Sequence, residues 1–122
     1  MASKIVRFTV SLSIADGKLE AFEKIAEAML AATRSEPGAL GYDWYLSSDR
    51  RHCRLLETYA DADAVVTHLT GPVVQESVPK LLAVAALNSF EVYGPRPQSV
   101  SYARWIWCGY ICTLACILES TV

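Results

Sequence analysis

The chain has 122 residues, enough for one domain with a single hydrophobic core. Hydrophobic residues make up 52% of it and the formal net charge is −2, so its charge gives no support for binding to nucleic acid or to an anionic membrane. Its four cysteines lack the paired spacing of a zinc site, and we expect no metal.

The N-terminal residues Met1–Lys4 are polar, and the apolar residues that follow alternate with polar ones. A signal peptide would instead need a continuous apolar run. We therefore expect a cytoplasmic protein without a transmembrane segment.

The first elements predicted are a strand and an amphipathic helix. Residues Ile5–Ile14 alternate between apolar and polar, which is typical of a strand with one buried face. After a turn in which Asp16 is a candidate helix cap, Leu19–Thr33 has the apolar stripe of a helix that lies on a sheet. Pro37 and Gly38 then end the helix.

A hairpin and a short helix follow. Leu40–Leu46 and His52–Tyr59 are predicted strands, and the short polar loop Ser47–Arg51 between them indicates antiparallel pairing. Asp61 offers a side-chain oxygen to cap a helix that extends to Leu69.

The last part of the domain completes a recognisable order. We expect Val73–Ala86 to form two short helical pieces with a kink at Pro79, and Asn88–Tyr93 to form the fourth strand. The order β-α-β-β-α-β predicts a ferredoxin-like α+β domain, with an antiparallel sheet covered by helices on one face. Such an open sheet face is commonly covered by a second copy of the chain, so we expect a homodimer.

The C-terminal segment does not fit this plan. We assign residues 1–97 to the domain and 98–122 to an apolar tail that contains cysteine and tryptophan. Trp105–Leu118 is about fourteen residues without charge, short of the ~20 that span a bilayer as a helix. Helix and strand both remain open, as do a swap onto a partner subunit, a place on a membrane surface and sequence foreign to the domain.

An acid, a phenol and an imidazole are the best functional candidates. Alternation along the third strand places Glu57 and Tyr59 on one face, and the following helix carries His68 back over that strand. Imidazole titrates near neutrality, so His68 is a candidate general base for a phenolic or enolic substrate. The structural alternative for His68 is a hydrogen bond to a strand carbonyl.

The other candidates also have structural alternatives. Glu57 either orients a base or is bonded to Arg54, Arg7 or a backbone amide. The rings of Tyr59, Tyr42 and Trp44 either form a wall for a flat substrate or pack within the sheet. Asn88 either presents its amide to a substrate oxygen or begins a strand. The candidate substrate-binding residues are therefore Tyr59, Trp44, Tyr42 and Asn88.

Residues from about Ile5 to Pro95 resemble the antibiotic biosynthesis monooxygenase (ABM) family of dimeric α+β barrels. The resemblance is carried by the opening strand with D-G-K-L-E-A-F, by E-P-G-A-L-G-Y, by L-L-E-T-Y-A-D-A-D-A-V-V-T-H-L and by S-F-E-V-Y-G-P. It implies a homodimer whose two sheets pack face to face, with a pocket in each subunit between sheet and helices. Glu57 and His68 match the family's acid and histidine positions.

The resemblance also implies an activity. Similar proteins include quinol monooxygenases that need no cofactor and oxidise quinols and polycyclic phenols with O₂, and on this basis His68 is the expected base. A non-catalytic small-molecule-binding or stress-related dimer is the alternative. Haem degradation, another branch, is disfavoured because the first strand has no asparagine and Tyr59 stands where that branch has tryptophan.

Overall fold

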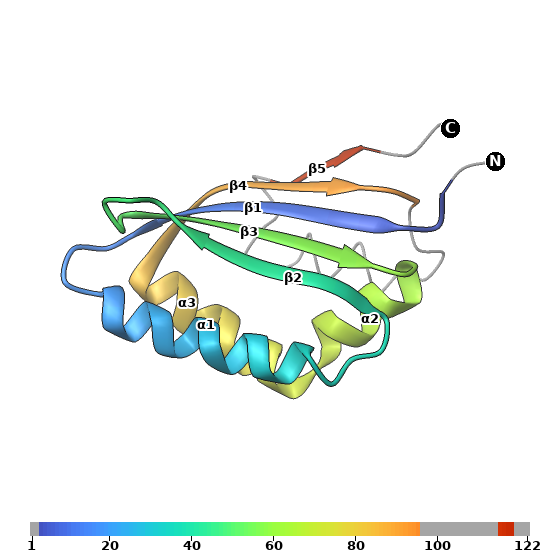
Figure 1. Cartoon of the computed structure of the whole chain (residues 1–122), viewed down its shortest axis with the longest axis horizontal. Coiled ribbons are helices and arrows are strands. Elements are labelled where there is room, and N and C mark those ends of the chain that lie inside the picture. The colour runs from blue at the N-terminus through green and yellow to red at the C-terminus, as the bar shows by residue number, and fades with distance from the viewer. Residues whose placement is uncertain (1–2, 96–114, 119–122) are drawn as a thin grey trace.

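A computed structural model describes residues 3–95 and the strand at 115–118. Figure 1 shows the elements, which follow one another along the chain as β1 (Val6–Ile14), α1 (Leu19–Thr33), β2 (Ala39–Leu46), β3 (His52–Tyr59), α2 (Ala62–Thr70), α3 (Pro72–Val84), β4 (Ala85–Tyr93) and β5 (Ala115–Leu118). No helix in the described residues is long and apolar enough to cross a membrane.

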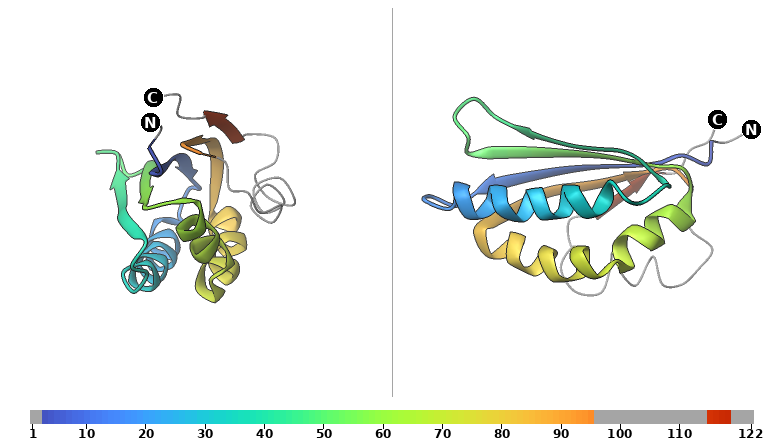
Figure 2. Two further views of the ribbon diagram at one scale, coloured as in Figure 1. Left: turned by 90° about the vertical axis from the view of Figure 1, so that its right-hand side faces the viewer. Right: turned by 60° about the horizontal axis from the view of Figure 1, so that its bottom comes forward.

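The described strands form one sheet in the order β2-β3-β1-β4-β5. Strands β1 to β4 pair antiparallel, which confirms the predicted ferredoxin-like α+β fold. Strand β5 lies parallel to β4 and is the one described part of the predicted tail; the rest of that prediction lies outside the described residues. The three helices lie together against one face of the sheet (Figures 1 and 2).

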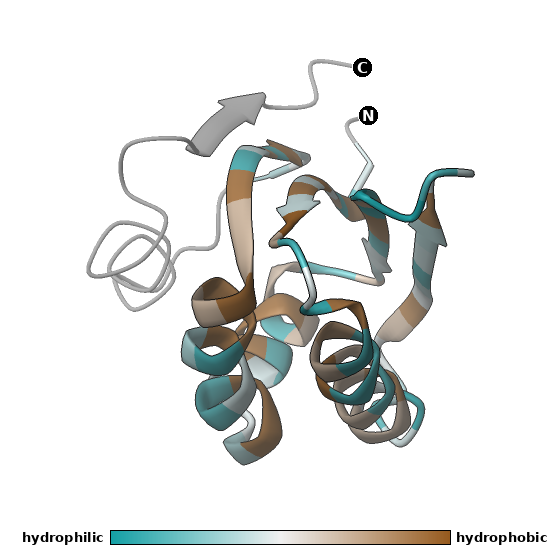
Figure 3. Ribbon diagram, turned by 90° about the vertical axis from the view of Figure 1, so that its left-hand side faces the viewer, coloured by the Kyte–Doolittle hydropathy of each residue, from teal (hydrophilic) through white to brown (hydrophobic). Residues whose placement is uncertain are grey.

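The predicted alternation of β1 is confirmed by its burial. Val6, Phe8 and Leu12 are at most 1% exposed and face the helices, while the polar residues that alternate with them face the other side of the sheet. Figure 3 shows the same alternation of hydrophobic and hydrophilic residues along the strands. The hydrophobic core therefore lies between the sheet and the helices, where burial of apolar area stabilises the fold.

The predicted division of this segment into two helical pieces at Pro79 is wrong, because α3 is a single helix with this proline inside it. Pro79 lies on the exposed side of α3, where water can bind the carbonyl that loses its backbone donor. The fourth strand also begins earlier than predicted, at Ala85, because Ala85 and Ala86 pair with the end of β1.

The predicted cap at Asp16 is also wrong. The chain turns at Gly17, which has a φ of 74°, and the N–H of Lys18 donates to the carbonyl of Ala15 at 3.0 Å. This turn places Lys18 at the cap position of α1, without a side-chain cap. The predicted cap of α2 is confirmed, since the N–H of Ala64 donates to Asp61 Oδ1 at 2.8 Å.

The turn between α1 and β2 is packed tightly against the start of α2. A Cβ atom on Gly38 would lie 2.5 Å from the Cβ of Ala64, so only glycine allows this approach. The N–H of Ala60 also donates to the carbonyl of Gly38 at 2.9 Å. This contact brings the turn, and Glu36 within it, beside the helix that carries His68.

Candidate functional site

The candidate site lies between β2, β3 and α2, on the helix side of the sheet. Glu57 and Tyr59 point to this side because they alternate with outward-facing residues along β3. His68 lies on the buried face of α2, together with Val65. His68 is 2% exposed, Glu57 5% and Tyr59 0%, so the structure brings three of the predicted residues together in the interior.

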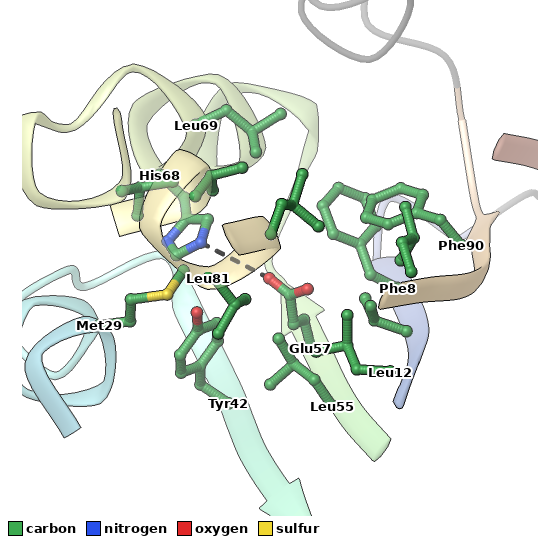
Figure 4. Close-up of a pocket in the computed structure, with 15 residues that line it drawn as sticks. Phe8, Leu12, Met29, Tyr42, Leu55, Glu57, His68, Leu69, Leu81 and Phe90 are labelled. Atoms are coloured by element: carbon green, nitrogen blue, oxygen red, sulfur yellow. Dashed lines mark ion pairs between the residues drawn. The ribbon is translucent and has the colours of Figure 1, made fainter. Parts of the chain in front are cut away.

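The imidazole of His68 lies between two carboxyl groups. Its Nδ1 atom is 3.2 Å from both Oε1 and Oε2 of Glu36, and its Nε2 atom is 3.5 Å from Oε1 of Glu57 (Figure 4). An ionised carboxylate only accepts hydrogen bonds, so the contact with Glu36 places the ring proton on Nδ1. In the described residues, the partners of His68 are therefore carboxyl groups, where the structural alternative expected a strand carbonyl.

Glu57 has a second partner in Tyr59, whose hydroxyl donates to Glu57 Oε1 at 2.5 Å. Burial raises the pKa of Glu57 from 4.5 to about 7; the hydrogen bond from Tyr59 opposes this rise and the nearby charge of Glu36 adds to it. The pKa of Tyr59 is also raised, chiefly by burial and then by Glu57. Tyr59 is therefore a neutral donor, and Glu57 changes its protonation near neutral pH.

Burial lowers the pKa of His68, while the charge of Glu36 and its hydrogen bond raise it. The net direction is downward from 6.5, so the imidazole is neutral at pH 7. A neutral imidazole that is protonated on Nδ1 has a free electron pair on Nε2. The site therefore holds a neutral proton acceptor that faces the carboxyl group of Glu57.

An apolar cavity of about 80 Å³ adjoins these groups. Figure 4 shows side chains from the sheet and from the helices around it, with Glu57 and His68 as polar groups in an apolar wall. The residues that line it are Phe8, Val10, Leu12, Met29, Tyr42, Leu55, Glu57, His68, Leu69, Val74, Val78, Leu81, Leu82, Leu87 and Phe90.

Tyr42 is the predicted substrate-binding residue that lines this cavity. Its ring lies 5.2 Å from that of His68, and its hydroxyl is buried without a hydrogen-bond partner in the described part of the chain. Burial, followed by the charge of Glu57, raises the pKa of Tyr42 well above its usual range. A neutral, unpaired phenol beside a cavity is available to a ligand oxygen.

The other predicted substrate-binding residues lie elsewhere. The ring centroid of Tyr59 lies 5.2 Å from that of His68. Tyr59 is outside the residues that line the cavity, but its hydroxyl is bonded to Glu57, which lines it. Trp44 lines a separate hollow of about 210 Å³ with Phe22 and Cys53. Asn88 donates to the Ser13 hydroxyl at 2.7 Å, outside the residues that line the cavity.

Glu36 is the residue of this cluster that the sequence did not predict. Its E-P-G segment was interpreted as the end of a helix, although the same segment carried part of the family resemblance. The contact joins residues 32 positions apart, so no local periodicity reveals it. Among the described residues, no group of three or more histidine, cysteine, aspartate or glutamate side chains is placed to hold a metal ion.

The described residues form a ferredoxin-like domain with an acid–imidazole pair at the edge of an apolar cavity. The family model "Antibiotic biosynthesis monooxygenase" matches residues 5–80, and the chain belongs to this family. A comparison with the sequences of curated proteins found no match.

Solved structures share the fold. MupZ from Pseudomonas fluorescens is 25% identical, with a TM-score of 0.72 over 96% of this chain and 90% of that one. A conserved protein of unknown function from Bacteroides thetaiotaomicron is 22% identical, with a TM-score of 0.68 over 75% and 97%. A protein from Nitrosomonas europaea, provisionally described as an antibiotic biosynthesis monooxygenase, is 18% identical, with a TM-score of 0.67 over 75% and 88%.

Proposed function

We propose that this protein is a cofactor-independent monooxygenase that oxidises a quinol or an aromatic polyketide-like phenol with O₂. The observation that carries the proposal is the neutral imidazole of His68, buried at the edge of an apolar cavity with Glu57 3.5 Å from its Nε2 atom. Membership of the monooxygenase family supports the reaction class.

In the proposed reaction, His68 removes a proton from the bound phenol or enol. The resulting anion is electron-rich enough to pass an electron to O₂ without a metal or a flavin. For an anthrone-like substrate, a ring methylene becomes a carbonyl: one oxygen atom enters the ring carbon and the other leaves as water with the two methylene hydrogens. The substrate supplies all four electrons, and the proton held by His68 returns to the departing oxygen.

The proposed roles of the other residues follow from their places. Glu57 orients the substrate hydroxyl beside His68, and the unpaired hydroxyl of Tyr42 donates to a second substrate oxygen. Tyr59 holds Glu57 through its 2.5 Å hydrogen bond. Trp44 and Asn88, at their positions outside the cavity lining, support the strands that carry these groups.

The size of the cavity limits how a substrate enters. At about 80 Å³ it is smaller than the ~150 Å³ of an apolar cavity that binds benzene. A polycyclic phenol therefore requires movement of the lining side chains. Met29 is the most adaptable of them, because its unbranched thioether changes rotamer easily.

Oxygen uptake by the purified protein, stripped of metal and flavin, tests the proposal. We would measure it against hydroquinones and anthrone-like phenols, with His68→Ala alongside and His52→Ala as the matched control, since His52 is exposed at the far end of β3. We expect uptake above autoxidation that is lost in His68→Ala and kept in His52→Ala, with one ¹⁸O atom from ¹⁸O₂ in the product. An active His68→Ala enzyme would refute the assigned base.

A non-catalytic small-molecule-binding dimer is the second candidate, and the almost wholly apolar cavity lining favours it. Uptake no faster than the buffer blank, combined with a rise in Tm on addition of an apolar ligand, would support this function over the first. Addition of haem tests the third and weaker candidate, because haem binding would produce a Soret band.

A further inference from the structure

We infer that Glu36 is the positioning residue of this site: its carboxylate holds the proton of His68 on Nδ1, so that Nε2 is the atom that receives the substrate proton. The inference deepens the proposed function and rests on it for the role of His68 as base. It concerns a residue on the turn that follows α1, far from His68 in sequence.

The geometry of the contact carries the inference. Both oxygens of Glu36 lie 3.2 Å from Nδ1, so the carboxylate faces this nitrogen symmetrically. The opposite nitrogen, Nε2, faces Glu57 at 3.5 Å, a distance longer than a hydrogen bond. A substrate hydroxyl is therefore the group that can complete the bonding of Nε2.

The carboxyl groups of Glu36 and Glu57 differ in exposure, and we assign them different roles. The Glu36 side chain is 18% exposed and that of Glu57 is 6% exposed. The carboxylate in contact with solvent keeps its charge more easily, and a fixed negative charge beside Nδ1 stabilises the imidazolium that forms when Nε2 takes a proton.

The backbone of the turn fixes Glu36 independently of its side chain. Its N–H donates to the carbonyl of Thr33 at 3.0 Å, and its carbonyl accepts from the N–H of Ala39 at 3.2 Å. Gly38 holds the same turn against Ala64 of α2. A substitution at Glu36 therefore leaves the turn bonded and changes chiefly what His68 contacts.

Nitrogen NMR of the two histidines tests the inference without any substrate. The sequence has two, and the exposed His52 is an internal reference within each sample. We expect wild-type His68 to carry its proton on Nδ1. In Glu36→Gln the pKa of His68 should fall further, because the amide keeps a hydrogen bond but loses the charge, and in Glu36→Ala the preference for Nδ1 should be lost.

The groups that face His68 and enter this titration are Glu36 from the turn, Glu57 and Tyr59 from β3, and Tyr42 from β2. Glu23→Gln is the matched control, since it removes a carboxylate of α1 that pairs with Arg50 at 3.5 Å on the surface. This control should leave the titration of His68 unchanged.

Kinetics supply the second readout. Glu36→Gln should lower kcat for O₂ uptake by about 10- to 100-fold, the range found for groups that orient metal-bound histidines, with little change in KM. Glu36→Asp should recover part of this loss. Unchanged tautomer and pKa of His68 in both Glu36→Gln and Glu36→Ala would overturn the inference, whatever the activity.

The two proposals fail in different ways. Wild-type protein that oxidises no substrate, but whose His68 responds to Glu36→Gln as described, would contradict the monooxygenase and leave the positioning role intact. An active enzyme that depends on His68 and keeps its full kcat in Glu36→Gln would contradict the positioning role alone.

Discussion

Glu57 is the most unusual residue of the site. Its carboxyl group is buried, and carboxyl groups are rarely buried without a positively charged partner. Its neighbours in the described part of the chain are the phenol of Tyr59 and the imidazole of His68. Its raised pKa is therefore a direct consequence of burial, and it links the protonation of the site to the stability of the fold.

This linkage predicts a pH dependence. Below about pH 4.5 the Glu57 carboxyl is protonated in both the folded and the unfolded chain, and its contribution to stability is fully present. As the pH rises through about 7, the unfolded chain ionises first and this contribution is lost. The shift of the Glu57 pKa from 4.5 to about 7 corresponds to about 3 kcal/mol of unfolding free energy at most. Replacement by glutamine removes the titrating group, so the loss should be absent from Glu57→Gln.

Urea unfolding of wild type and Glu57→Gln between pH 4 and pH 8.5, as about a dozen paired samples, measures this effect. The difference between the two proteins is the quantity to follow, because His68 acts in the opposite sense. Its pKa is lowered in the folded state, so its own contribution is lost as the pH falls through 6.5 and below. A difference in unfolding free energy that is constant across this range would contradict the prediction.

Tyr59 is expected to stabilise the fold through its hydroxyl. In Tyr59→Phe the ring still packs against Phe8 and His68, but Glu57 loses its one close donor. We expect a loss of about 1–3 kcal/mol in unfolding free energy at neutral pH, the usual cost of removing a partner from a buried group. Tyr45→Phe, on a ring that is 55% exposed, should change stability little. Equal stability of the two variants would contradict this role.

At the scale of elements, the turn before β2 and the start of α2 act as one unit. Adding a Cβ at Gly38 forces apart the turn that carries Glu36 and the helix that carries His68, because the new atom would lie 2.5 Å from the Cβ of Ala64. We expect Gly38→Ala to cost about 1–3 kcal/mol, as overpacking usually does, and to shift the NMR signals of His68.

Two variants make this prediction specific. Gly41→Ala is the matched control, since its new Cβ would meet Thr58 at an ordinary 3.6 Å. The double variant Gly38→Ala/Ala64→Gly removes the opposing methyl group and should recover part of the lost stability in thermal unfolding. No recovery in the double variant would mean that the contact with Ala64 is not the source of the strain.

Elements with a strong local pattern could be predicted from the sequence, and contacts across the chain could not. The alternation of β1 and the cap at Asp61 follow from neighbouring residues, and so does the shared face of Glu57 and Tyr59. The contact between Glu36 and His68 forms only through tertiary packing, so no periodicity in the sequence predicts it. Trp44 shares a face with Tyr42, but its place further along β2 puts it at a different hollow.

At the scale of the whole molecule, the two faces of the sheet differ in what covers them within the described residues. The helices cover one face (Figure 2). The other face carries exposed apolar side chains from β2 and β3, the two strands farthest from β4 and β5. Leu56 on β3 is 41% exposed and Tyr45 on β2 is 55% exposed. Exposed apolar groups on an uncovered sheet face are typical of a surface that binds another protein, and a second copy of this chain is the partner that we propose.

The last prediction follows from that surface. At micromolar concentration, sedimentation should give about twice the chain mass of 13.4 kDa for the wild type. Leu56→Glu should shift the protein toward the monomer, because like charges would face each other when two sheets pack together. Leu46→Glu is the matched control: this leucine is equally exposed, at 39%, but lines the hollow beside α1. A dimer that survives Leu56→Glu and is broken by Leu46→Glu would place the interface at the hollow beside α1, and the uncovered sheet face would then need another explanation.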